Sequence, residues 1–158
     1  MEIKTSRSQL LIAERLFSTI WIGGMWTVGF IVVPILFANL DDRRLAGELA
    51  GHLFSVINII GLVCCLLILI GRISMGGTGW LKCWQSGILI LMAVLILVMH
   101  FGLQPYMAEI KTHGALVEGS ALAVKFAQLH KTSSLIYTLV CLLGLILVIF
   151  GLDRRSSK

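Results

Sequence analysis

Charged residues are scarce in this sequence of 158 residues. Asp, Glu, Lys and Arg make up 13% of the chain and hydrophobic residues make up 58%, whereas an ordinary soluble domain is roughly a quarter charged and under half apolar. The scarcity is also local, because no charged residue occurs in 16–40, 49–71, 83–108 or 132–152, which are runs of 25, 23, 26 and 21 residues. This pattern excludes a soluble globular protein.

The lengths of these charge-free runs indicate membrane spans. A helix needs about 20 predominantly apolar residues to cross the hydrocarbon core of a bilayer, and it satisfies its own backbone hydrogen bonds where water is absent. We therefore expect an all-α fold, an integral membrane four-helix bundle with spans at about 16–40, 52–71, 84–104 and 132–152. Little chain remains outside the spans, so residues 1–158 are expected to form one domain in the lipid bilayer.

The distribution of basic residues predicts the topology. The two termini and the second connection carry eight Lys and Arg residues, and the first and third connections carry five. Because short cytoplasmic segments hold the excess of basic residues, we expect both termini in the cytoplasm of a cell with this chain in its inner membrane. The net charge of +5 is then mostly a topology signal. No nucleic-acid-binding motif accompanies it, so no nucleic acid is expected as a partner.

The connections contain signals for short helices. Asp41 can cap an amphipathic helix over 42–51 at the outer interface, which would lead into the second span. Pro105 is expected to kink or end the third span just outside the membrane. Ser120 can cap a helix that continues into the fourth span. The sequence thus predicts short amphipathic helices on the outer face of the bundle.

Four cysteines raise the question of a disulfide or a metal site. Cys64 and Cys65 lie in the second span, Cys141 lies in the fourth, and Cys83 lies at the cytoplasmic end of the third. None is placed to meet an oxidising compartment, so all four are expected to be reduced packing residues. The adjacent pair also lacks the usual spacing of metal ligands.

Small and polar residues predict which helix faces are buried. Gly23 and Thr27 form a small-xxx-small pair on the first span, and such pairs let helix backbones approach closely in a membrane. On the fourth span, Tyr137 and Gly144 share one face. Asn58 is a polar residue at membrane depth on the second span, where a hydrogen bond between helices would satisfy it. These five residues are the predicted helix-packing positions.

Three histidines are the candidate metal ligands. His52, His100 and His130 lie on three different spans. Each lies about 27–35 Å along its helix from the charged residue at the cytoplasmic end of its span, so the three side chains are expected at a similar depth near the outer membrane surface. Imidazole suits copper, zinc and haem iron, and an ionisable residue at membrane depth is a functional hypothesis by default. The alternative is that these side chains only form hydrogen bonds between helix ends at a wet interface.

Several short motifs resemble a known family. Trp21, Gly23, Gly24, Phe30, Pro34, Leu36 and Phe37 are followed by Phe54 with Gly61, by the run 103–107, and by Phe126, Leu129, His130, Ser133 and Tyr137. Over about residues 10–150 this order resembles the transmembrane protein 205-like family, which implies a four-helix membrane protein with no established reaction. The chain is more distantly similar to copper-resistance-protein-D-like membrane proteins and to haem-dependent membrane protoporphyrinogen oxidases, where histidines near helix ends matter.

Three kinds of function follow from these patterns. The first is an accessory or structural subunit that packs beside other membrane subunits or its own copies. The second is binding of copper or haem by the outer histidines, and the third and weakest is a small transporter. Transport would need polar groups through the whole membrane depth, and here they are expected to become sparse on the inner side of Asn58. No buried carboxylate and no set of catalytic residues is expected in the spans, so we expect no catalytic activity.

Overall fold

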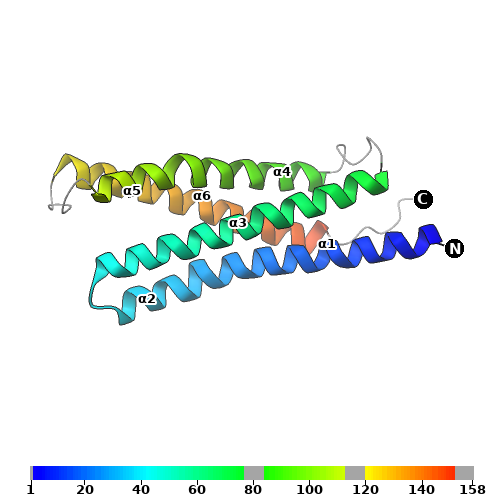
Figure 1. Ribbon diagram of the computed structural model, residues 1–158, viewed down its shortest axis with the longest axis horizontal. Coiled ribbons are helices and arrows are strands. Elements are labelled where there is room, and N and C mark those ends of the chain that lie inside the picture. Colours follow the sequence, from blue (N-terminus) through cyan, green and yellow to red (C-terminus); the bar gives the residue numbers. More distant parts are fainter. Residues whose placement is uncertain (1, 77–83, 113–119, 152–158) are drawn as a thin grey trace.

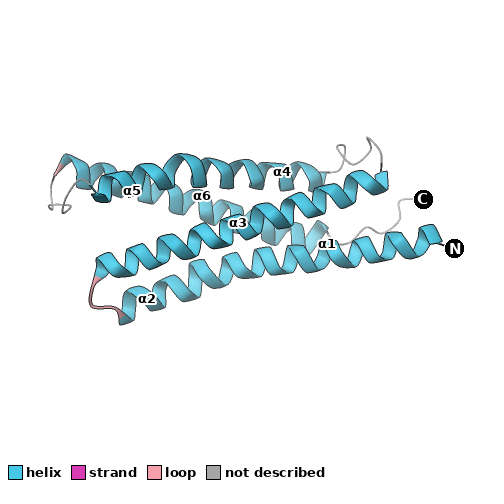
Figure 2. Cartoon of the chain, in the orientation of Figure 1, coloured by secondary structure: helices cyan, strands magenta, loops and turns pink. Residues whose placement is uncertain are grey.

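The computed structural model describes residues 2–76, 84–112 and 120–151, and every regular element in these ranges is a helix (Figure 2). The first helical stretch consists of α1 (Glu2–Thr27), the π-helical segment η1 (Val28–Val32) and α2 (Val33–Asn39). It is followed by α3 (Arg43–Gly76). The third stretch consists of α4 (Trp84–Leu97), the π-helical segment η3 (Val98–Leu103) and α5 (Gln104–Thr112), and α6 (Ala121–Gly151) is the last element.

Four of these stretches are long and apolar enough to cross a membrane: Gln9–Asn39, Arg43–Ser74, Trp84–Ile110 and Ala121–Phe150. The expected all-α membrane fold is therefore confirmed. The helices are antiparallel to their neighbours in sequence, and α1 packs against α3 and α6 while α4 packs against the same two helices (Figure 1). We use the name "terminal end" for the end of the bundle that contains the start of α1 and the last turn of α6. The opposite end of the bundle is named the far end.

Hydrophobic side chains fill the core and also cover the outside. Trp21, Met25, Leu89 and Met92 are almost completely buried, whereas Phe101 is 71% exposed. Lipid solvates apolar surface as well as a protein core does, so hydrophobicity alone does not bring these helices together. Cys64, Cys65 and Cys141 are free and buried, whereas Cys83 lies outside the described residues.

Glycines provide the close contacts between helices. The indole ring of Trp21 on α1 lies against Gly61 on α3, and the ring of Tyr137 on α6 lies against Gly29 in η1. A Cβ atom added to Gly24 would lie 2.6 Å from Ile57 Cδ1, and one added to Gly144 would lie 2.9 Å from Ile22 Cγ1. Each glycine thus makes room for a large side chain of another helix.

The predicted packing positions are placed differently by the structure. Asn58, Tyr137 and Gly144 lie inside the bundle, and Tyr137 and Asn58 are 6% and 0% exposed. Gly23 and Thr27 lie on the exposed side of α1, and no atom lies within 4 Å of a Cβ added to Gly23. The close contact of α1 with α3 is made by Gly24 instead. One residue corresponds to a rotation of 100° on a helix, so adjacent glycines face different surroundings.

A hydrogen bond between helices coincides with the π-helical segment η1. The Tyr137 hydroxyl donates to the backbone carbonyl of Met25, with an oxygen–oxygen distance of 2.6 Å. In a regular α-helix this carbonyl would accept from the N–H of Gly29. The helix widens into η1 one residue before Gly29, as expected where a side chain inserts into the ladder of backbone hydrogen bonds. The indole N–H of Trp26 adds a second bond between α1 and α6, to the carbonyl of Cys141 at 3.3 Å.

Two expected features at the start of α3 are wrong. Asp42, not Asp41, caps α3, because its Oδ1 accepts from the backbone N–H groups of Arg44 and Leu45 at 2.8 and 3.2 Å. The short outer helix expected over 42–51 is the first part of α3 and no separate element. Pro105 does not end the third helix, which continues through α5, and the π-helical segment η3 just before it gives the chain a wider turn, with the N–H of Gln104 bonded to Met99. The alternative, a kink at Pro105, stays a prediction.

The cap expected at Ser120 is present. Its hydroxyl accepts from the backbone N–H of Ala123 at 3.1 Å, and α6 then runs without interruption to Gly151. The connection after Gly76, which contains Gly77, Gly79 and Trp80, lies outside the described residues, as does His113.

The contact of Trp21 with Gly61 predicts a large effect of one methyl group. Gly61→Ala would place a Cβ against a rigid, fully buried indole ring, so we expect a loss of about 1–3 kcal/mol in the free energy of unfolding. Gly51→Ala on the same helix is the matched control, because a Cβ there meets no atom within 4 Å. Gly51→Ala should leave stability unchanged or raise it by up to about 1 kcal/mol. Denaturation in mixed detergent micelles measures both, and equal stabilities of the two variants would contradict the contact.

Candidate functional site

A buried ion pair joins three helices near the terminal end of the bundle. Arg72 on α3 is 2% exposed and Glu14 on α1 is 8% exposed. The guanidinium donates from Nε to Glu14 Oε1 at 3.2 Å and also from Nη2 to the same oxygen. Its Nη1 donates to the hydroxyl of Ser86 on α4 at 2.8 Å. Arg72 thus holds α1 and α4 against α3.

This ion pair contradicts the expectation that the spans contain no buried carboxylate. In the sequence, Glu14 lies next to Arg15 and outside the first charge-free run, so its position indicates a residue of the inner terminus, and Arg72 has the position of a topology charge. The apolar helices nevertheless include both residues, since the first is Gln9–Asn39 and the second is Arg43–Ser74. A signal for the pair was present in the spacing: Asn58, Cys65 and Arg72 recur every seven residues and therefore share one face of α3.

Burial makes this pair energetically sensitive. Each charge loses its hydration inside the bundle, and the mutual attraction with added hydrogen bonds offsets that cost only while both partners are present. In membrane proteins such residues also mark functional sites. The pair is therefore both a structural contact and the first part of a candidate site.

The second part of the site consists of buried polar groups between α1 and α3. Ser18 and Trp21 follow Glu14 on the same face of α1, and Asn58 lies on the face of α3 that carries Arg72. These three side chains are 1%, 0% and 0% exposed. We call the set of Glu14, Ser18, Trp21, Asn58 and Arg72 the polar seam. It corrects the expectation that polar groups become sparse on the inner side of Asn58.

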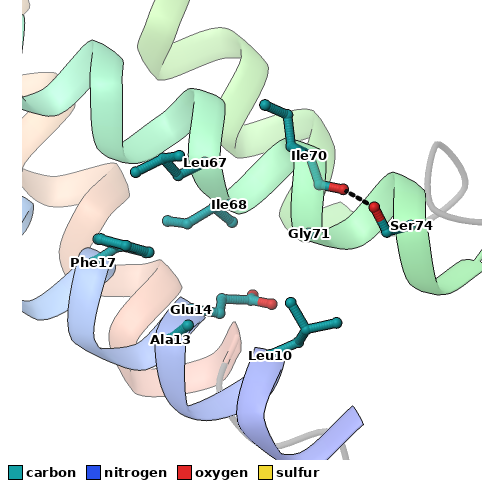
Figure 3. A pocket seen from close by; sticks show the side chains of 9 residues that line it. All are labelled: Leu10, Ala13, Glu14, Phe17, Leu67, Ile68, Ile70, Gly71 and Ser74. Atoms are coloured by element: carbon teal, nitrogen blue, oxygen red, sulfur yellow. Dashed lines mark hydrogen bonds between the residues drawn. The ribbon is translucent and has the colours of Figure 1, made fainter. Parts of the chain in front are cut away.

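A groove opens beside the polar seam at the terminal end. It has a volume of about 190 Å³ and lies between α1 and α3, with Leu10, Phe17, Ile68 and Gly71 among its lining residues. The carboxylate of Glu14 reaches into it (Figure 3). Apart from Glu14 and Ser74, the lining is apolar, so the groove brings one acidic side chain to an otherwise hydrophobic surface.

The three candidate histidines do not form a shared centre with one another. His52 and His130 are exposed, and His100 in η3 is half-buried. His130 stacks on Phe126 and His100 lies edge-on to Phe101. Within 2–76, 84–112 and 120–151, no group of three or more His, Cys, Asp or Glu side chains is arranged to hold a metal ion. Metal binding by these histidines stays a prediction.

A comparison with protein families matches residues 16–116 to a domain of unknown function, DUF4149. The chain belongs to the DUF4149 family. Glu14 of the site precedes the matched range, which includes Ser18, Trp21, Asn58, Arg72 and Ser86. No curated protein and no solved structure matches the chain. This DUF4149 protein is thus a multi-pass membrane protein whose family has no assigned function.

Loss of one partner of the ion pair should be costly. We expect Arg72→Met to lower the free energy of unfolding by about 3–5 kcal/mol, because it leaves the Glu14 carboxyl buried without its counter-charge. The double variant with Glu14→Met should be clearly more stable than Arg72→Met alone. Arg43→Met removes an exposed arginine of the same helix α3 and should change stability by less than about 0.5 kcal/mol. Detergent denaturation measures all three, and a double variant no more stable than Arg72→Met would argue against the pair.

Proposed function

We propose that this DUF4149 protein acts by association, as an accessory or structural subunit that packs against other membrane subunits or its own copies. The observation that carries the proposal is the position of Gly23 and Thr27 on the exposed side of α1. They do not serve the contact with α3, which uses Gly24. A small-xxx-small pair on a membrane-facing surface lets a helix of another chain approach closely.

Polar groups at the far end of the bundle support the same proposal. Arg44 and Glu48 form an ion pair whose side chains are 78% and 48% exposed. Lys125 donates to the Tyr106 hydroxyl at 3.2 Å and lies 5.0 Å from the centre of that ring. These groups lie at the surface, whereas Glu14 and Arg72 are occupied with each other inside the bundle. The exposed groups are therefore the polar contacts that a partner would meet.

Association through α1 gives a testable difference between assembly and folding. We expect Gly23→Leu to reduce the assembly found after mild extraction at least tenfold, because the leucine would hold a partner helix away, while thermal stability stays unchanged. Gly87→Leu is the matched control and should leave assembly unchanged. Like Gly23, Gly87 is exposed on its helix, and no atom lies within 4 Å of a Cβ added there. Native mass measurement and crosslinking in native membranes provide the readout. A monomer in native membranes, or equal assembly of both variants, would refute the proposal.

Binding of copper or haem is the second candidate function. One observation favours it: the Nδ1 atom of His100 is buried and has no hydrogen-bond partner among the described residues. The distant resemblance to copper-resistance-protein-D-like proteins points in the same direction. A visible spectrum and metal analysis of the purified protein test this alternative. Haem or stoichiometric copper that is lost on joint replacement of His52, His100 and His130 would favour it over association.

A small transporter is the third candidate, with the polar seam as its support.

The proposed location is an inner membrane with both termini in the cytoplasm. It follows from the excess of basic residues near the termini and the second connection. We expect reporter fusions at Lys158 and Gly114 to lie on opposite sides of the membrane, with Lys158 in the cytoplasm. A cytoplasmic reporter at Gly114 would reverse the orientation and place the three histidines on the inner side.

A further inference from the structure

Four polar atoms of the seam have no hydrogen-bond partner among the described residues. They are Ser18 Oγ, Trp21 Nε1, and both Nδ2 and Oδ1 of Asn58. All three side chains are at least 99% buried. A buried amide or hydroxyl without a partner costs roughly 1–3 kcal/mol, and the great majority of such groups in proteins are paired with protein or ordered water. So many unpaired atoms between the same two helices of a membrane bundle therefore indicate a bound polar molecule.

The contacts of α1 with α3 place these atoms in one line. Trp21 lies against Gly61, which is one helical turn from Asn58. Ser18 lies one turn from Trp21 toward the terminal end, and Glu14 lies one turn further. The line from Asn58 to Arg72 covers 14 residues of α3, or about 21 Å. The unpaired atoms thus continue directly from the ion pair into the middle of the bundle.

The groove supplies room and an entrance at the terminal end of this line. Its volume of about 190 Å³ is many times the roughly 10–15 Å³ that a cavity needs to hold one water molecule. Glu14 lines the groove, and its carboxylate reaches into it (Figure 3). Ser18 lies one helical turn from Glu14 on the same face of α1, so a polar molecule in the groove lies about one turn from the first unpaired atom.

We propose that the polar seam is a water-binding half-channel, in which water enters through the groove at Glu14 and reaches Trp21 and Asn58 midway through the bundle. The four atoms fit water, because the Trp21 indole needs an acceptor, whereas the Asn58 carboxamide and the Ser18 hydroxyl use both donors and acceptors. Water provides both in the smallest volume. The half-channel does not depend on the proposed association, since no residue of the seam lies on the exposed side of α1.

The two tryptophans of α1 provide an internal comparison. The Trp21 indole N–H has no partner among the described residues, whereas that of Trp26 donates to the carbonyl of Cys141. In the full chain in lipid nanodiscs, with ¹⁵N-labelled tryptophan, we expect a cross-peak between water and the Trp21 indole proton. We also expect this proton to exchange into D₂O at least tenfold faster than that of Trp26. The single variants Trp26→Phe, Trp80→Phe and Trp84→Phe assign the signals. A Trp21 indole without a water cross-peak, including one bonded directly to Asn58, would overturn the proposal.

Blocking the groove tests the route. Gly71→Leu adds a side chain that fills the groove, where a Cβ would lie 3.6 Å from Leu10 Cδ2, and we expect it to slow Trp21 exchange at least tenfold. Gly87→Leu adds the same side chain to the exposed surface of α4 and should leave the exchange of the Trp21 indole proton unchanged. Gly71→Leu should likewise leave the exchange of the Trp26 indole proton unchanged. Asn58→Leu should remove the water cross-peak. Unchanged Trp21 exchange in Gly71→Leu would refute the entrance at Glu14, and a persisting cross-peak in Asn58→Leu would refute the site at Asn58. If Asn58→Leu does not fold, the wild-type chain and Gly71→Leu still decide the proposal.

Discussion

The ion pair of Glu14 with Arg72 is the interaction on which the terminal half of the bundle depends. It is the contact that joins α1, α3 and α4 through charged groups, since Arg72 also bonds to Ser86. Both side chains are buried in the bundle and have lost most of their hydration, so each needs the other. The position of three helices relative to one another is thereby coupled to one salt bridge, whereas lipid gives the same helices no hydrophobic reason to associate.

Toward the far end, the helices are held by shape and by single hydrogen bonds. Gly61 receives Trp21 and Gly29 receives Tyr137, so an aromatic ring of one helix lies directly on the backbone of another. Tyr137 then bonds to the carbonyl of Met25 where the helix widens into η1. The distinction between the two halves is physical: charge holds the terminal half, and close packing holds the other half.

This division also separates the two proposals for the DUF4149 protein. Association uses the outer surface of α1, where Gly23 and Thr27 are exposed, and the exposed charged groups of the far end. Hydration uses the inner surface of the same helix, where Glu14, Ser18 and Trp21 are buried. A single helix therefore presents a small-residue surface to the membrane and a polar surface to the bundle, and substitutions on the two surfaces test different functions.

The sequence by itself determined the number of spans, because long runs without charge have no other stable environment than a membrane. It also predicted the cap at Ser120 and the polar residue Asn58 as an interior group. Only the tertiary structure decided that Gly24 rather than Gly23 meets α3, that Glu14 pairs with Arg72, and that His52 and His130 face outward. In a membrane helix apolar residues cover every side, so the hydrophobic pattern that identifies the buried side in soluble proteins is weak. The contacts with neighbouring helices therefore select the buried face, and those contacts join residues such as Glu14 and Arg72 that lie 58 positions apart in the chain.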